Sequence, residues 1–194
     1  MKKIMFNDKF SLTQAVLDGR KTQTRRIVPS NYWLTQRSLP GLNDEYIERA
    51  NAHLLNYSRY KLGEVVAVAQ SYKDCGNYHV PKEHPGWNNK LFVAALLMPH
   101  RISITNVRVE RLQDISDEDC LAEGIEKVKE CENLYRVPIY HKSGRITYIS
   151  ADTPREAYAA LIDKISGKGT WESNPWVFLY DFERLENKSL GTAS

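Results

Sequence analysis

Three segments of the chain have the apolar spacing and the end signals of α-helices. They span about residues 11–18, 116–123 and 154–165. In the first, Ser11 and Gln14 have the pattern of a capping box, and Gly19 follows the last helical residue. The second begins at Ser116, continues with three acidic residues in its positive first turn, and ends at Gly124.

The third helical segment has the strongest signals. Thr153 is its predicted N-cap, Pro154 takes the first helical position, and Glu156 completes a capping box. Its apolar residues recur at helical spacing, so one face of the helix is predicted to enter the core. These residues are Tyr158, Leu161, Ile162 and Ile165.

Short strands are predicted around these helices. They span residues 64–69, 101–112, 146–149 and 176–185. In the second strand the alternation of apolar residues slips near Asn106, which indicates a β-bulge. Aromatic residues alternate along the last strand, as in a core strand. They are Trp176, Phe178, Tyr180 and Phe182. Short strands interrupted by short helices favour a mixed α/β (α+β) fold built on a small closed barrel, rather than a doubly wound sheet.

The length of 194 residues indicates one domain. We expect this domain to span residues 1–186, with residues 187–194 as a disordered tail of small and polar residues. Three stretches that contain proline, glycine and polar residues are expected to be insertions. They span residues 29–60, 73–90 and 127–152, and the last is expected to form a hairpin.

Composition excludes several classes of protein. Hydrophobic residues make up 42% and charged residues 26% of the chain, as in ordinary globular proteins. The longest apolar run, residues 91–98, is far shorter than the roughly 18 residues of a membrane span, and the N-terminus has no secretory pattern. The three cysteines, Cys75, Cys120 and Cys131, are an odd and small set, which favours free thiols. We therefore expect a cytoplasmic protein without a membrane partner.

Opposite charges are concentrated in two segments. Residues 1–37 hold eight basic and two acidic side chains, whereas residues 110–132 hold nine acidic and three basic ones. A basic segment can contact phosphates. The two segments can instead pair with each other or face solvent, and an imbalance of this size favours this second interpretation.

The segment from Gly19 to Arg26 is the densest cluster of reactive groups. It reads Gly-Arg-Lys-Thr-Gln-Thr-Arg-Arg and follows the first predicted helix. Lys21 can act as a base if burial or neighbouring cations lower its pKa, and Thr24 can act as a nucleophile beside such a base. The two side chains meet only if the chain turns between them, because residues three apart on a flat strand face opposite ways. The alternative is a solvated basic turn.

A second motif, residues 167–176, reads Gly-Lys-Gly-Thr-Trp-Glu-Ser-Asn-Pro-Trp. It lacks the spacing of a P-loop. Lys168 beside Trp171 can hold a phosphate and stack a base, as in proteins that bind single strands. The alternative is a tight turn in which Trp171 covers the core.

Cys75, His79 and His84 lie close together in the sequence, but their spacing is not that of a zinc site. No dinucleotide fingerprint and no serine-hydrolase elbow occur in the chain. We therefore expect neither a metal nor another cofactor.

Residues 18–26 resemble the signature of ASCH domains, a branch of the PUA-like β-barrel superfamily. The usual pattern is Gly-x-Lys-x-x-Glu-x-Arg, and this chain has Gly19, Lys21 and Arg26, with Thr24 in place of the glutamate. The same threonine variant occurs in small bacterial acetylcytidine amidohydrolases. In those enzymes a lysine and a threonine of this motif act with a glutamate from a later acidic helix.

The resemblance extends over most of residues 4–185, to ASCH-like proteins common in bacteriophages and prophages. The shared motifs are Gly-Arg-Lys-Thr-Gln-Thr-Arg-Arg, Val-Glu-Arg-Leu-Gln-Asp-Ile, Ala-Glu-Gly-Ile and Gly-Lys-Gly-Thr-Trp-x-x-Asn-Pro-Trp-Val. One motif departs from the pattern. Phage relatives often read Trp-Val-Arg-Glu-x-Trp where residues 67–72 read Ala-Val-Ala-Gln-Ser-Tyr, and Gln70 is expected to keep part of the polar contact.

This resemblance implies a hydrolase that acts on RNA or a modified nucleoside, with Lys21, Thr24 and Glu123 as catalytic residues. Lys21 would accept a proton from Thr24, Thr24 would attack an amide carbonyl, and Glu123 would position or protonate the leaving amine. A non-catalytic RNA- or nucleotide-binding module and a single-strand ribonuclease are the alternatives. The candidate binding residues are Arg20, Arg25, Arg26, Gln70, Arg101, Lys168, Trp171 and Asn174. Charge reversal at Arg25 or Arg26 is expected to weaken RNA binding with little effect on folding.

Overall fold

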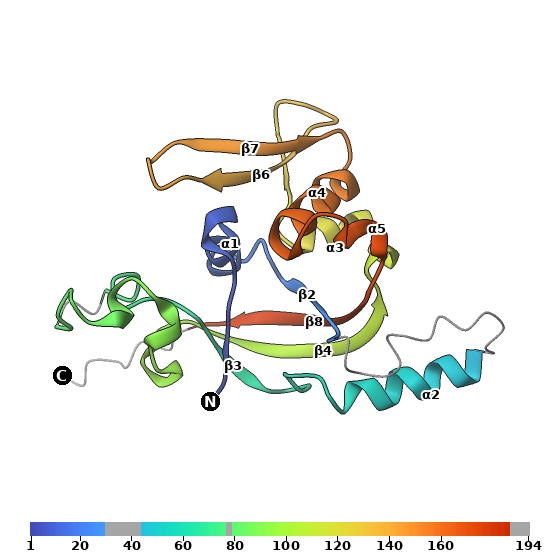
Figure 1. Cartoon of the computed structure of the whole chain (residues 1–194), viewed down its shortest axis with the longest axis horizontal. Coiled ribbons are helices and arrows are strands. Elements are labelled where there is room, and N and C mark those ends of the chain that lie inside the picture. The colour runs from blue at the N-terminus through green and yellow to red at the C-terminus, as the bar shows by residue number, and fades with distance from the viewer. Residues whose placement is uncertain (30–43, 77–78, 187–194) are drawn as a thin grey trace.

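Eight strands in two sheets frame the described part of this computed structural model, residues 1–29, 44–76 and 79–186 (Figure 1). The larger sheet has the strand order β1-β3-β4-β8-β2, and the smaller has the order β5-β6-β7. The strands are β1 Lys3–Ile4, β2 Gln23–Ile27, β3 Val65–Val68, β4 Arg101–Arg111, β5 Glu126–Lys127, β6 Tyr135–Tyr140, β7 Ile146–Ala151 and β8 Trp176–Leu185. The mixed α+β class predicted from the sequence is confirmed. Among the described strands no ladder joins the edge strands β1 and β2, so the closure of the larger sheet into the predicted barrel stays a prediction.

Helices in the described residues include all three that the sequence predicts. The α-helices are α1 Leu12–Leu17, α2 Asp44–Leu55, α3 Asp117–Ala122, α4 Pro154–Ser166 and α5 Thr170–Ser173. The predicted caps of α3 and α4 form. Ser116 Oγ accepts a hydrogen bond from the Asp119 N–H at 3.1 Å, and Thr153 Oγ1 accepts one from the Glu156 N–H at 3.2 Å. None of the described helices is both long and apolar enough to cross a bilayer.

The capping box predicted for α1 is wrong. Ser11 has a φ of 56°, and its side chain makes no capping hydrogen bond. It takes this conformation because it also ends the 3-10 turn Asp8–Phe10, where its N–H donates to the Asp8 carbonyl. Gln14 donates to the Asp18 carboxylate at 2.7 Å instead of reaching back to Ser11.

The long strands β4 and β8 form the middle of the larger sheet. β8 pairs with β4 on one side and with β2 on the other. The register of β4 shifts between Ile104 and Asn106, so the predicted bulge is confirmed. The aromatic side chains predicted to face the core on β8 lie inside it, three of them buried and Trp176 half-buried. The buried ones are Phe178, Tyr180 and Phe182.

Helix α4 lies between the two sheets, beside α3 (Figure 1). Its buried residues Tyr158, Leu161 and Ile162 belong to one core cluster with β8. The fourth residue predicted for this face, Ile165, is 38% exposed at the end of the helix. Strands β6 and β7 pair as the hairpin expected within residues 127–152.

The segment that follows β3 has a small core of its own. Its members come from β3, from the residues that directly follow β3, and from the predicted insertion at 73–90 with the residues just after it. They are Ala67, Ala69, Tyr72, Trp87, Val93 and Met98. The predicted tail, 187–194, and residues 30–43 of the first predicted insertion lie outside the described residues.

Candidate functional site

The connection from α1 to β2 brings Lys21 and Thr24 to the same cavity. Gly19 leaves the helix with a φ of 76°, a conformation that favours glycine. The chain then folds back, with the Lys21 N–H donating to the Ala15 carbonyl at 2.9 Å and the Thr22 N–H to the Ala122 carbonyl at 2.9 Å. Lys21 and Thr24 both line this cavity, which is the proximity that their predicted chemistry needs.

Lys21 and Glu123 form a buried ion pair. Glu123 follows the last residue of α3, and the side chains of Lys21 and Glu123 are only 1% and 7% exposed. The Lys21 ammonium donates to the Glu123 carboxylate and, at 2.8 Å, to the Glu123 carbonyl. Burial lowers the pKa of Lys21, Glu123 opposes this effect, and Arg26 and Arg25 add to it. The condition stated from the sequence, a pKa lowered by burial or by neighbouring cations, is therefore met, and burial is the larger of the two causes.

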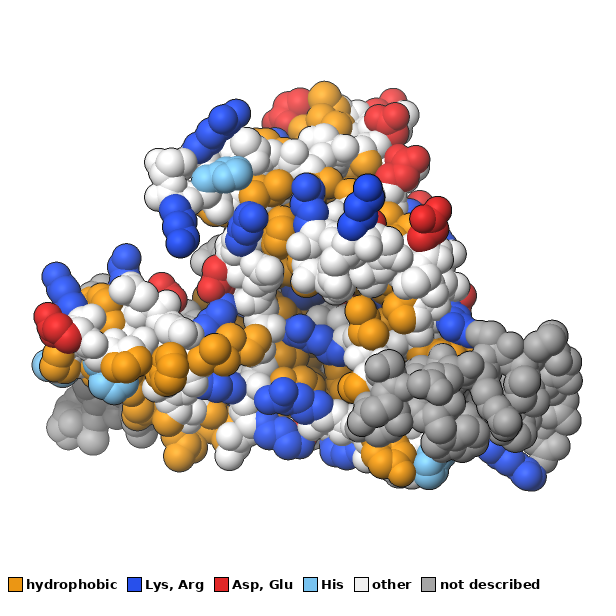
Figure 2. All heavy atoms as spheres, in the orientation of Figure 1, with side chains coloured by type: hydrophobic (Ala, Val, Ile, Leu, Met, Phe, Trp, Pro, Cys, Tyr) orange, Lys and Arg blue, Asp and Glu red, His pale blue; other side chains and the backbone are white. Residues whose placement is uncertain are grey.

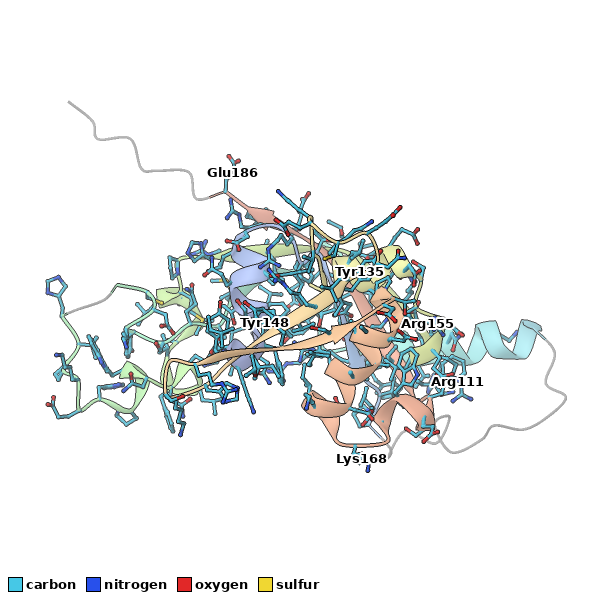
Figure 3. The ribbon with its side chains drawn as sticks, turned by 90° about the horizontal axis from the view of Figure 1, so that it is seen from above. Arg111, Tyr135, Tyr148, Arg155, Lys168 and Glu186 are labelled. Carbon is cyan, nitrogen blue, oxygen red and sulfur yellow. The ribbon has the colours of Figure 1, made fainter. Side chains whose placement is uncertain are left out.

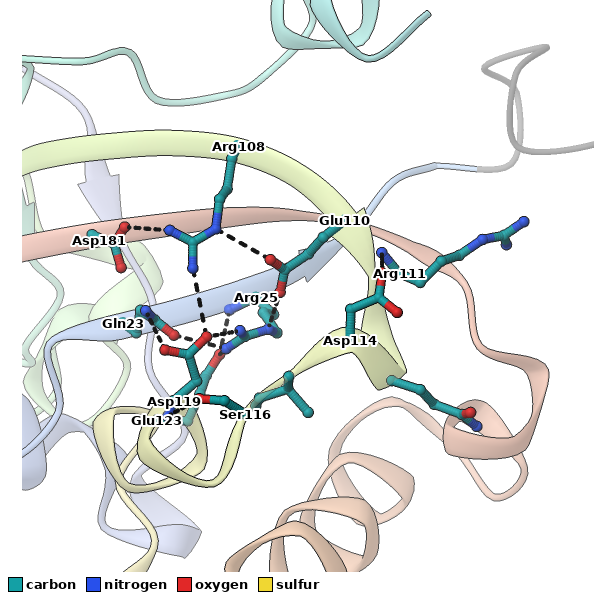
Figure 4. Close-up of polar contacts among 12 residues, drawn as sticks. Gln23, Arg25, Arg108, Glu110, Arg111, Asp114, Ser116, Asp119, Glu123 and Asp181 are labelled. Carbon is teal, nitrogen blue, oxygen red and sulfur yellow. Dashed lines mark hydrogen bonds and ion pairs between the residues drawn. The ribbon is translucent and has the colours of Figure 1, made fainter. Parts of the chain in front are cut away.

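Arg25 is the centre of a buried polar network (Figure 4). Its side chain is fully buried, and the guanidinium donates to Glu110 at 2.8 Å, to Asp119 at 2.6 Å and to Glu123 at 3.3 Å. It also donates to the Gln23 side chain at 2.9 Å. Burial opposes the charged form, but Glu123 and Glu110 outweigh burial and raise the pKa of Arg25. The guanidinium is therefore occupied and has no exposed surface for a phosphate.

Arg108 extends this network to the surface (Figure 4). It lies 3.2 Å from Glu110, 3.5 Å from Asp119 and 3.1 Å from Asp181. Together with the bonds of Lys21 and Arg25, these contacts join basic residues to the acidic segment at 110–132. The interpretation that the two charged segments pair with each other is confirmed for these residues.

A cavity of about 280 Å³ lies beside the ion pair. The sequence predicted a site around Lys21, Thr24, Arg26 and Glu123, and all four line this cavity. Thr24 is 4% exposed, and its hydroxyl makes no hydrogen bond within the described residues. The rest of the wall is mostly apolar and comes from α1, β2, α4 and β8. It includes Phe6, Leu12, Leu112, Leu161, Ile162 and Val177.

The arginines on either side of Lys21 have different surroundings. Arg26 is half-buried, donates to the Met5 carbonyl at 2.5 Å and lies over the Phe6 ring at 5.7 Å. Arg20 is exposed and pairs with Glu126 at 3.2 Å. Of the arginines at 20, 25 and 26, only Arg20 is both exposed and outside the cavity.

The motif at 167–176 does not line this cavity. Lys168 is exposed and projects from the turn between α4 and α5 (Figure 3). Trp171 is half-buried, with its ring centroid 6.2 Å from that of Tyr158 and the Arg155 guanidinium 5.1 Å away. Asn174 accepts the Gln113 N–H at 2.8 Å, which ties the loop to the end of β4.

Two further candidates lie elsewhere. Arg101 is exposed at the start of β4, and Gln70 is buried beside a different cavity. Tyr158, which the sequence predicted only as a core residue, lines the Lys21 cavity, and burial raises its pKa well above the ordinary value. The sequence also did not single out Glu110 and Asp119, although their place in the acidic segment was a usable signal.

No group of three or more histidine, cysteine, aspartate or glutamate residues in the described ranges could hold a metal ion. His84 accepts the Gly86 N–H through Nδ1 at 2.9 Å, and Cys75 is a half-buried free thiol. The protein was also compared with family models, characterised proteins and solved structures, and none matches.

Cys120, which lies next to this network on α3, is expected to resist alkylation in the folded protein. Its thiol is buried, and burial raises its pKa to about 12, whereas Cys131 is exposed. Iodoacetamide at pH 8 should modify Cys131 first and reach Cys120 only after denaturant is added, as mass spectrometry can show. Equal rates of alkylation of Cys120 and Cys131 in the folded protein would contradict the burial of Cys120.

The buried Cys120 thiol also predicts a pH dependence of stability. Because its folded pKa is raised from the ordinary value of 9.0, the stability that Cys120 contributes is lost as the pH rises from about 9 to 12.

Proposed function

We propose that this chain is an ASCH-type protein with a PUA-like fold, and that the Lys21 cavity hydrolyses an amide of a modified nucleoside. One observation carries the proposal. Lys21, Thr24 and Glu123, which are up to about a hundred positions apart in the sequence, line one buried cavity of about 280 Å³. This volume is near the lower end of ligand pockets, so the acetylated base rather than a longer RNA segment would enter it.

The proposed reaction uses the three side chains in sequence. The Thr24 oxygen attacks the amide carbonyl and forms a C–O bond, while its proton passes to the neutral amine of Lys21. The C–N bond then breaks, and the leaving amine receives a proton held by the Lys21–Glu123 pair. Water hydrolyses the resulting threonine ester, which releases the carboxylate and restores the hydroxyl. The lowered pKa of Lys21 supports this role because it favours the neutral amine.

Hydrolysis of N4-acetylcytidine by the purified protein tests the proposal. Thr24→Ala is expected to lower the rate by about 100-fold or more, because it removes the hydroxyl that attacks the amide. Among the described residues, only Tyr158 and Ser166 bring another hydroxyl to the cavity wall. Thr24→Ser should retain part of the activity. The rate of the wild-type protein should rise with pH through the lowered pKa of Lys21, since the neutral amine is the base. Lys21→Arg should be inactive because a guanidinium stays protonated.

Thr22→Ala is the matched control, since Thr22 is exposed and lies two residues before Thr24. It should leave the rate unchanged. Equal rates of the wild-type protein and Thr24→Ala would refute the covalent route.

A non-catalytic RNA-binding module is the second candidate, and the surface favours it. Lysine and arginine side chains gather over the middle of the face in Figure 2. Lys2, Arg20, Arg59 and Lys168 are exposed, and exposed cations are what phosphate contact requires. RNA binding that survives Thr24→Ala, in a protein without hydrolytic activity, would favour this module. Arg25 lines the Lys21 cavity but offers no exposed cation to RNA, because its side chain is buried.

A further inference from the structure

Helix α4 contributes a row of side chains to the wall of the Lys21 cavity. The residues of the row are Tyr158, Leu161, Ile162, Ile165 and Ser166. Ile165 and Ser166 are exposed at the end of the helix, whereas Tyr158 is only 2% exposed. A rise of about 1.5 Å per residue separates Tyr158 from Ile165 by about 10 Å along the helix. Tyr158 therefore lies at the enclosed end of the cavity.

The hydroxyl of Tyr158 is unpaired, in contrast to those of two other buried tyrosines. Tyr60 donates its hydroxyl proton to the Lys3 carbonyl at 3.0 Å, and the Tyr180 hydroxyl accepts the Arg59 N–H at 3.2 Å. The Tyr158 hydroxyl makes no hydrogen bond within the described residues. Buried hydroxyls are almost always hydrogen-bonded, so this one needs a partner from outside the chain.

A molecule in the cavity can reach the Tyr158 hydroxyl. In the described part of the chain, the unpaired side-chain polar atoms that are completely enclosed belong to Gln70 and Arg136. The Tyr158 oxygen is not one of them, so it keeps accessible surface. Because the rest of the residue is buried and lines the cavity, this surface faces the cavity.

The Tyr158 ring has a fixed position. It belongs to the core cluster that joins α4 to β8, and the Trp171 ring lies edge-on to it, with 6.2 Å between the ring centroids. Side chains packed in this way stay in one rotamer, which holds their polar atoms in a defined direction.

The phenol is also a neutral donor at physiological pH. Burial raises the pKa of Tyr158, and the Glu123 carboxylate acts in the same direction. This carboxylate is already occupied, since it accepts hydrogen bonds from the Lys21 ammonium and, at 2.7 Å, from the Arg25 N–H. The phenol proton is therefore not used within the protein and is available to an acceptor on a ligand.

The proposed hydrolysis needs a donor of this kind. Attack by Thr24 turns the carbonyl oxygen of the amide into an oxyanion, and hydrogen bonds to such an oxygen are among the largest contributions to catalysis. Lys21 and Glu123 carry the protons of the reaction, and neither is aimed at that oxygen in the proposed steps. The carbonyl oxygen is thus the atom without a partner in the reaction, as the phenol is in the cavity.

We propose that the Tyr158 hydroxyl donates a hydrogen bond to the carbonyl oxygen of an amide bound in the Lys21 cavity, and that it stabilises the negative charge formed when Thr24 attacks. The phenol keeps its proton throughout, and no covalent bond to Tyr158 forms. The proposal rests on the proposed hydrolase function, because it assigns a further catalytic residue to the same reaction.

Steady-state hydrolysis of N4-acetylcytidine by Tyr158→Phe tests the proposal. The variant keeps the ring and removes only the hydroxyl. We expect kcat to fall by about 100-fold, as for the loss of one oxyanion donor. KM should rise by less than about tenfold, because the neutral carbonyl of the bound substrate accepts a weaker hydrogen bond than the oxyanion does. The urea midpoint should not fall, since the hydroxyl has no partner in the protein.

Tyr60→Phe is the matched control, because Tyr60 is a buried tyrosine that does not line the cavity. Its hydroxyl is bonded to the Lys3 carbonyl, so the control should lower the urea midpoint and leave kcat unchanged. Unchanged kcat in Tyr158→Phe would overturn the proposal. A loss of stability in Tyr158→Phe as large as that in Tyr60→Phe would also overturn it, since the hydroxyl would then be structural.

A binding measurement separates failure of this proposal from failure of the hydrolase proposal. N4-acetylcytidine is titrated by calorimetry into Thr24→Ala and into the double variant Thr24→Ala with Tyr158→Phe. The double variant should bind about three- to tenfold more weakly, as for the loss of one neutral hydrogen bond. If the wild-type protein has no hydrolytic activity but this difference is found, the hydrolase proposal fails and the role of Tyr158 toward the carbonyl stands. Equal affinities, or no binding to Thr24→Ala, would overturn the role of Tyr158.

Discussion

Replacement of Arg25 by methionine is expected to lower the free energy of unfolding by about 3–5 kcal/mol, because it leaves one buried and two half-buried carboxylates without their main cation. Three acidic side chains contact the guanidinium, at 2.8 Å for Glu110, 2.6 Å for Asp119 and 3.3 Å for Glu123. Arg108 contacts two of them but is 43% exposed, so it compensates only in part. Urea denaturation followed by circular dichroism measures the loss.

Arg25→Lys is the control for charge alone. It keeps the cation but replaces three spaced guanidinium nitrogens, each bonded to a different carboxylate, with one ammonium nitrogen, so a smaller loss of stability than in Arg25→Met is expected. Charge reversal at Arg25 should prevent folding, in contrast to the expectation from the sequence that folding would change little. A fully stable Arg25→Glu protein would contradict the network. Arg20→Glu serves as the exposed counterpart and should change stability by less than about 1 kcal/mol.

Glu123→Ala is also expected to lower the free energy of unfolding by about 3–5 kcal/mol, because it leaves the Lys21 ammonium buried without an opposite charge. The Lys21 side chain is 1% exposed, and Glu123 supplies the opposing carboxylate. The same carboxylate also accepts the Arg25 N–H at 2.7 Å, so its removal unpairs a backbone donor as well. Glu123→Gln keeps the shape and an acceptor oxygen, and we expect it to lose less stability.

The pH dependence of Glu123→Ala separates this cause from a simple packing defect. Burial already lowers the pKa of Lys21, and Glu123 opposes that shift. Without Glu123 the folded pKa falls further below the unfolded value, so the unfolded state binds more protons over a wider range. The stability of the variant should therefore rise as the pH is raised toward 10. The double variant Lys21→Met with Glu123→Leu should recover stability at every pH, since no charge is left buried. A pH-independent loss would point to packing instead.

The helix caps and the β-bulge of this protein could be predicted from the sequence because their signals involve residues only a few positions apart. The caps at Ser116 and Thr153 depend on hydrogen bonds to residues three positions away, and both form. The bulge near Asn106 follows from the two-residue period of a strand, which one extra residue interrupts. Ser11 shows the limit of such signals. Its capping pattern was present, but the preceding 3-10 turn held its backbone in a left-handed conformation.

Only some residues of the candidate site could be predicted from the sequence. The motif at 19–26 drew attention to Lys21 and Thr24, and the resemblance to ASCH domains added Glu123. The sequence could not show that the side chain of Arg25, the residue after Thr24, turns away from solvent into a group of carboxylates. Neighbouring positions on a strand face opposite sides, and which side is buried depends on what packs there. The partners of Arg25 come from β4 and α3, about 85 to 98 positions away.

The sequence by itself determined the mixed α+β class, the positions of helices α1, α3 and α4 and of strands β3, β4, β7 and β8, and the clustering of reactive groups at 19–26. These features follow from propensity, period and capping, which act over a few residues. Only the tertiary structure decided which charges are buried, which side chains share a cavity, and that Gln70 faces a different one. Burial and pairing arise when segments far apart in the chain pack together, and no local pattern encodes that geometry.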